Sequence, residues 1–135
     1  ESMASQEITA TTQIEVATLP YSCNFEGQGT NGWLIKNGTC TNKWWVGDVN
    51  SSTNSALFVT GDNGITSSYD NMNNTSVVIA EKQIQLGQTD SIRISFDLKV
   101  GGDDYTNYLK VFFVPVSTNF EPATYRNNFA ASNYS

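Results

Sequence analysis

The chain has 135 residues, a formal net charge of −6 and a charged fraction of only 15%. This length is enough for one domain. The excess of acidic residues disfavours a phosphate-binding surface for nucleic acid. The absence of His excludes Ser-His-Asp and Cys-His catalysis and the common mixed zinc sites. No apolar run is long enough to cross a membrane, so we expect neither a nucleic-acid partner nor membrane insertion.

Cys23 and Cys40 are the two cysteines of the chain. The sequence is rich in Asn, Ser and Thr and poor in Lys, which favours a location outside the cytoplasm. In that location a disulfide between the two would persist, whereas in the cytosol both would stay reduced. Both states remain open from the sequence, and a bridge would add about 3 kcal/mol of stability in the chain-entropy account.

Residues 1–18 are polar, with Ile8, Ile14 and Val16 spaced as in a short extended segment. We interpret this stretch as a linker, as the end of a preceding domain, or as a disordered tail. The folded domain is then expected over 19–135.

From residue 19 onward the chain alternates between short apolar or aromatic runs and clusters of Gly and Asn. Gly and Asn tolerate the positive φ angles that tight turns require. The sequence Asp62-Asn63-Gly64 is a strong turn signal, followed by a polar loop over 65–75. The expected strands in this part of the chain are 21–25, 33–36, 43–46, 55–60 and 77–80.

The clearest alternation covers residues 91–100, where apolar and polar side chains take turns. A period of two predicts a strand with one buried and one solvated face. A Gly-Gly-Asp-Asp turn follows, with Asp103 and Asp104 as solvated turn residues, and a second strand is expected over 105–116. The two strands should form an antiparallel pair. The residues expected to face inward are Ile92, Ile94, Phe96, Leu98 and Val100 on the first strand, and Leu109, Val111 and Phe113 on the second, with Tyr108 and Phe112 facing outward.

No segment shows a convincing helical period, and β-branched residues are abundant, so the predicted class is all-β, an antiparallel β-sandwich. The stretch 117–135 lacks alternation, and the strand count falls short of a complete sandwich. The chain is therefore expected to be either a small sandwich or a piece of a larger one, with its sheet completed by other domains or subunits.

Four motifs in order resemble the cleaved-adhesin or choice-of-anchor J domains of Bacteroidetes surface proteins, which are related to the gingipain adhesin domains and more distantly to MAM domains. The motifs are LPYSCNFEG (19–27), NGTCTNKWWVG (37–47), SALFVTGDNG (55–64) and SIRISFDLKVGGDDYTNYLKVFFVP (91–115). The resemblance covers about 19–122 and implies a secreted or cell-surface jelly-roll sandwich, often calcium-bound, that acts in adhesion or carbohydrate binding. The chain departs from the family at Asn24 and Asn107, where the family carries acidic residues.

Calcium is bound by carboxylate, amide and backbone oxygens. Glu26 stands at the end of one expected strand and matches the Phe-Glu position of the family, while Asp62 and Asn63 stand in the turn after another. We expect these three residues to help hold one calcium ion. The alternative is structural, with Asp62 capping its own turn and Glu26 as a solvated strand end.

Adjacent strand residues point to opposite faces, so Trp44 and Trp45 cannot both enter one core. Val46 should share the face of Trp44, which leaves Trp45 on the outer face beside Lys43. An outward indole can stack on a sugar ring or a partner chain, or it can lie under a loop. Trp45, and more weakly Tyr69 in the polar loop, are the candidate ligand-binding residues.

Paired carboxylates alone do not indicate a glycosidase, because nothing places two of them in one cleft. We therefore expect a non-catalytic, secreted or cell-surface module that binds a glycan or a partner protein. The alternative is a structural or assembly domain of a surface fibre or particle, with no soluble ligand and with its aromatic stripe buried between subunits.

Overall fold

The computed structural model describes residues 14–27, 29–51, 53–70, 76–88, 91–101 and 109–122. Their regular elements are short strands and one 3₁₀ turn, with no α-helix, so the predicted all-β class is confirmed. In the same ranges no helix has the length and apolar character needed to span a bilayer. The strands are β1 (Val16–Thr18), β2 (Leu34–Lys36), β3 (Lys43–Asp48), β4 (Ser55–Thr60), β5 (Ile79–Glu81) and β6 (Gln83–Gln85), with the 3₁₀ turn η1 at Val49–Ser51.

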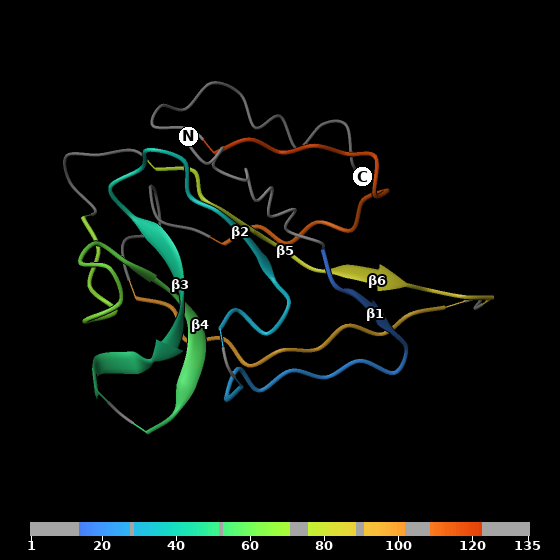
Figure 1. The fold of residues 1–135 in the computed structure, drawn as a ribbon, viewed down its shortest axis with the longest axis horizontal. Helices are drawn as coiled ribbons and strands as arrows, with labels where there is room; N and C mark the ends of the chain where they lie inside the picture. Colours follow the sequence, from blue (N-terminus) through green and yellow to red (C-terminus); the bar gives the residue numbers. More distant parts are fainter. Residues whose placement is uncertain are drawn as a thin grey trace, which may run out of the picture.

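Strands β3 and β4 form the longest ladder, an antiparallel pair that runs from Lys43 opposite Thr60 to Asp48 opposite Ser55 (Figure 1). Both strands were predicted, and β4 has the predicted bounds. Their sequences, KWWVGD and SALFVT, combine aromatic and β-branched residues that favour extended backbone. This hairpin is the frame on which the candidate site is built.

Two smaller sheets accompany the hairpin. Strands β2 and β5 pair antiparallel, close to their predicted positions, whereas β1 and β6 pair in parallel. The parallel pair departs from the purely antiparallel expectation, and its β1 strand comes from the stretch 1–18. The predicted strand at 21–25 is wrong, because these residues have no ladder partner within the part of the chain that the structure describes.

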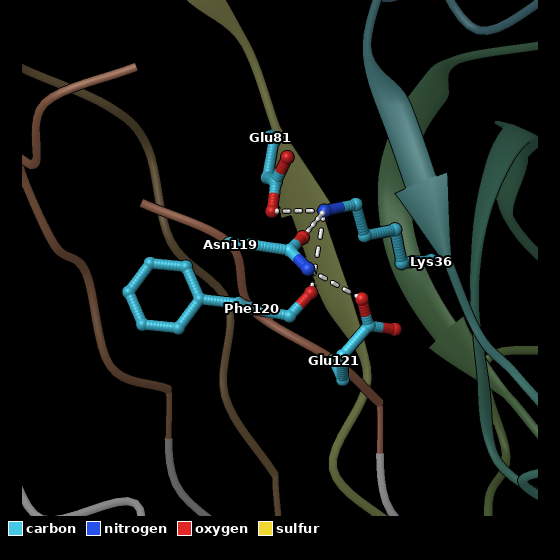
Figure 2. A network of polar contacts seen from close by, with 5 residues as sticks. All are labelled: Lys36, Glu81, Asn119, Phe120 and Glu121. Atoms are coloured by element: carbon cyan, nitrogen blue, oxygen red, sulfur yellow. Dashed lines mark hydrogen bonds and ion pairs between the residues drawn. The ribbon is translucent and has the colours of Figure 1, made fainter. Parts of the chain in front are cut away.

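Residues 118–122 lie beside the β2–β5 sheet and are tied to it by one cation (Figure 2). The ammonium of Lys36 on β2 pairs with the Glu81 carboxylate at 2.9 Å. It also donates to the Asn119 side chain and to the carbonyl of Phe120, each at 3.2 Å. Asn119 in turn donates to Glu121 at 2.7 Å, which completes the network.

The strand predicted at 91–100 is not formed with any described partner, and every residue of this stretch is exposed. Its alternation is real, but no neighbouring strand in the described part of the chain covers its apolar face. The inward set predicted for 109–116 is also wrong, because Leu109, Val111 and Phe113 are exposed. Phe112 instead turns toward the protein, where its ring lies 5.8 Å from that of Phe120, a residue held in place through Lys36.

The residues most deeply buried in the described ranges gather around the hairpin, where Phe58 is 8% and Thr60 0% exposed. Cys40 and Asn42, in the turn before β3, are the other two. Asn42 exchanges a pair of hydrogen bonds with the backbone of Asp70, at 2.7 and 2.9 Å. The hairpin is therefore fixed at this end by polar contacts as well as by apolar packing.

Several expectations fall outside the described residues. They are the stretch 1–13, the turn with Asp103 and Asp104, the outward position of Tyr108, the acidic-to-Asn change at Asn107, the loop residues 71–75, and the tail 123–135.

Candidate binding hollow beside strand β3

An open hollow of about 610 Å³ lies along strand β3. Residues 44–48 line it consecutively, so the hollow follows an edge of the strand and not one of its faces. Its aromatic lining comes from Phe25, Trp44 and Trp45, and its remaining lining from Gly27, Gly29, Thr30, Ile35, Asn37, Val46, Gly47, Asp48 and Ser55. An apolar, aromatic wall with a few polar groups is the usual make-up of a small-molecule site.

The edge of β3 that faces away from β4 is partly capped by Asn37. The Asn37 amide donates to the carbonyl of Trp44 at 3.1 Å and accepts from the Trp44 N–H at 2.8 Å. The Asn37 side chain thus stands where the backbone of a further strand would stand. Its hydrogen bonds show that the N–H and C=O of Trp44 point to this edge, and in an antiparallel ladder the backbone groups of every second residue point the same way.

The backbone of Val46 points to the same edge as that of Trp44, because the two residues are two positions apart. Its N–H and C=O therefore point to the edge that the hollow follows, and Val46 and Trp45 both line the hollow. The side chain of Asp48 lies further along the rim, where its Oδ1 accepts from the Ser55 hydroxyl at 2.7 Å. The hollow therefore offers a donor, an acceptor and a carboxylate next to aromatic surface.

Trp45 faces outward, as predicted, and is 39% exposed. Its indole lies against two glycines, Gly47 on its own strand and Gly64 in the turn after β4. Gly64 has φ +89°, and a Cβ there would overlap the indole ring. The Nε1 end of the indole thus lies close to backbone, while 39% of the residue remains exposed. Trp44, on the opposite face, donates its indole N–H to the carbonyl of Val78 at 3.0 Å.

The turn that seats Trp45 is organised by Thr60 and Asp62. The buried Thr60 hydroxyl donates to Asp62 Oδ1 at 2.6 Å and accepts from the N–H groups of Asp62 and Gly64, each at 3.2 Å. Asp62 also accepts from the N–H of Thr66 at 2.9 Å and from its hydroxyl at 2.7 Å. The hydrogen bonds from Thr60 and Thr66 lower the pKa of Asp62 to about 2. Asp62 is therefore an ionised turn cap, which is the structural alternative stated for it.

Glu26 lies at the other end of β4. Its Oε1 accepts the N–H of Ser55 at 3.0 Å, and its own N–H is bound by the side chain of Asn24 at 3.1 Å. A strand of six residues at about 3.4 Å per residue separates this end from the Asp62 turn by roughly 17 Å. The side-chain oxygen of Asn63, Oδ1, accepts a hydrogen bond from the ammonium group of Lys43 at 2.9 Å, so this oxygen already has a cationic partner.

These positions do not fit the expected calcium site. The carboxylates of Glu26 and Asp62 stand at opposite ends of one strand, so the two cannot contact one ion, whose ligands lie at 2.3–2.6 Å. Across the described ranges, no three acidic or thiol groups come together closely enough to hold a metal. The same carboxylates instead fix the two ends of β4.

Tyr69 does not join Trp45 at the hollow. Its hydroxyl donates to the carbonyl of Gly101 at 2.6 Å and ties the polar loop to the stretch 91–101. The two cysteines are not joined by a disulfide in this structure. Cys40 is buried and directs its thiol to the carbonyl of Val77 at 3.8 Å, whereas Cys23 is half-buried.

The sequence did not single out Phe25 or Asn37 as parts of a site. Phe25 has φ +63° and packs on Trp33 with ring centroids 5.9 Å apart, which turns it toward the hollow from a stretch predicted to be a strand. For Asn37, a signal exists in the sequence Asn-Gly seven residues before Trp44, since it predicts a tight turn that returns the chain beside the next strand.

Comparisons with protein-family models, with curated proteins and with solved structures find no match to this chain.

Proposed function

We propose that this chain is a non-catalytic, extracytoplasmic binding module that recognises a glycan in the hollow beside β3, on an all-β fold of the jelly-roll sandwich type. The single observation that carries the proposal is the seated but accessible indole of Trp45 beside the outward backbone groups of Val46. A sugar ring has an apolar face that stacks on an aromatic ring and hydroxyl groups at its rim that need donors and acceptors. The hollow offers both.

A glycan fits this edge better than an extended peptide does. A peptide that adds to a sheet needs a run of outward backbone groups along the edge strand. Here Asn37 occupies the edge at Trp44, so the outward groups begin only at Val46, two residues before β3 ends. One or two sugar units match that short stretch.

The ring of Trp45 is held before any ligand arrives, because its Nε1 end lies against Gly47 and Gly64. A ligand therefore stacks without ordering a mobile side chain, which lowers the entropic cost of binding. Removal of an aromatic anchor of this kind typically costs about 2 kcal/mol, which corresponds to roughly a thirtyfold loss of affinity.

A glycan array probed with the whole chain tests the proposal, followed by titration of the bound glycans against Trp45→Ala. We expect the array to show binding, and Trp45→Ala to weaken it at least about tenfold while circular dichroism shows that the variant remains folded. Ile65→Ala is the matched control, because Ile65 is 69% exposed and is not part of the hollow lining. A blank array, or equal affinity in Trp45→Ala and the parent, contradicts the proposal.

The alternative role, an assembly domain of a surface fibre or particle, is favoured by a different observation. Residues 92–100 and 109–116 expose apolar side chains in extended segments outside the six strands. Large apolar side chains exposed in such numbers often mark an interaction site.

A further inference from the structure

The stretch 91–100, named here the apolar ribbon, has the alternating pattern of a strand, and its residues 92–100 have no strand partner in the described part of the chain. Its apolar residues Ile94, Phe96, Leu98 and Val100 are 57%, 57%, 56% and 62% exposed. None of the backbone hydrogen bonds within the described part of the chain involves residues 92–100. Figure 1 draws this stretch in gold, below β1 and β6, as an extended trace without a strand arrow.

We propose that the apolar ribbon pairs with the same ribbon of a second copy of this chain, antiparallel and two-fold symmetric about Ser95. A two-fold antiparallel pair places each residue of the ribbon opposite a fixed residue of the partner copy. This contact is a specific form of the assembly role, and it does not depend on glycan binding.

The polar face of the ribbon selects this register. With the two-fold axis at Ser95, Arg93 lies opposite Asp97 of the partner copy, and this pair occurs twice. Lys99 then lies opposite Ser91, so no like charges meet. Moving the axis to Phe96 places Arg93 opposite Lys99, and moving it to Ile94 removes both ion pairs. Opposite charges contribute modestly at an exposed site but discriminate between registers, since like charges directly opposite are destabilising.

The apolar face is consistent with the same register. Ile94 lies opposite Phe96 of the partner copy, and Ile92 lies opposite Leu98. Pairs of aromatic and β-branched residues across an antiparallel ladder are among the favourable ones. A register shifted by one residue would place apolar side chains opposite polar ones on each face.

Pairing along this edge brings the apolar side chains of the two ribbons side by side on one face, which removes part of their exposed surface from water. Pairing also satisfies backbone groups along both ribbons, which an unpaired edge leaves to solvent.

Directed cross-linking tests the register. In this register Ser95 lies opposite Ser95 of the partner copy. The Cα atoms of the two Ser95→Cys residues would therefore stand about 4.5–5.5 Å apart, a separation that a disulfide can span. Mild oxidation should yield a covalent dimer. Ser91→Cys is the matched control, since its two copies would stand about 27 Å apart. The parent chain controls for Cys23 and Cys40. Equal cross-linking of both variants, or none with Ser95→Cys, overturns the proposal.

Charge exchange tests the same pairs without a cross-link. In sedimentation velocity over a concentration series, Arg93→Asp should raise the dimer dissociation constant at least about fivefold, because Asp then faces Asp. Combining it with Asp97→Arg should restore the parent value, since the opposite charges are exchanged and kept. A parent chain that stays monomeric, as it would if the ribbon paired with 109–116 of its own chain, refutes the proposal. A double variant whose dimer dissociation constant is as high as that of Arg93→Asp also refutes it. Either result leaves the glycan array as a separate test.

Discussion

Replacing Thr60 with Val should destabilise the turn that seats Trp45. The Thr60 side chain is fully buried, and its hydroxyl serves three hydrogen bonds, two of them from the backbone N–H groups of Asp62 and Gly64. Val has nearly the same shape but cannot accept them. At about 1 kcal/mol for each backbone bond, the loss is about 2 kcal/mol before any contribution from the Asp62 carboxylate.

For a chain of this size a loss of about 2 kcal/mol lowers the melting temperature by about 8 °C. Thermal unfolding followed by circular dichroism measures it. Thr18→Val is the matched control, because Thr18 is exposed on β1 and its replacement should change stability by less than about 0.5 kcal/mol. The fluorescence of Trp45 should also shift to the red in Thr60→Val as its seat loosens. A melting temperature within 2 °C of the parent would refute the assigned role of this hydroxyl.

Three further predictions follow from the same region. The pKa of Asp62 is lowered to about 2, so its contribution to stability is present above about pH 4 and is lost as the pH falls toward 2. Acid unfolding of Asp62→Asn should lack this part of the pH dependence, and identical profiles would contradict it. Gly64→Ala should lose at least about 1 kcal/mol and displace the indole of Trp45, because φ is +89° and the new methyl overlaps the ring; an unchanged melting temperature and tryptophan emission would argue against this contact. Any rise of the melting temperature in millimolar calcium should not depend on Glu26 and Asp62 together, because the two carboxylates stand at opposite ends of β4. A rise that Glu26→Gln and Asp62→Asn each abolish would contradict this separation.

The hairpin was predictable because its signals are local. Strand β4 is a compact apolar and β-branched run that ends at Asp62-Asn63-Gly64, a turn whose Asn63 and Gly64 both adopt positive φ. The outward position of Trp45 follows from the alternation of adjacent side chains along a strand. These features need no knowledge of the rest of the chain.

The remaining strands depend on contacts between distant segments. Strand β6 has a single apolar residue, Ile84, between two Gln residues, and it pairs with β1, which lies far away in the sequence. Period two in residues 91–100 predicts an amphipathic ribbon but does not supply its partner. Phe112 was predicted to face outward, and its contact with the protein likewise depends on Phe120, which Lys36 holds near β2.

The site was predicted in part. Trp45 was identified correctly as outward, but its neighbours at the hollow come from elsewhere, since Asn37 acts as a substitute for backbone and Phe25 adopts an unusual φ. The calcium expectation placed Glu26 and Asp62 together because both follow strands. Strand ends share a site only when the strands end at the same edge, and these two residues cap opposite ends of one strand.

Amide chemical shifts measured by NMR during titration with a glycan found on the array test the central claim most directly. If the hollow beside β3 binds the ligand, the largest changes should fall on the indole N–H of Trp45 and on the backbone N–H of Val46. Changes confined to residues outside the hollow, such as those near Tyr69 or in the apolar ribbon, would contradict it.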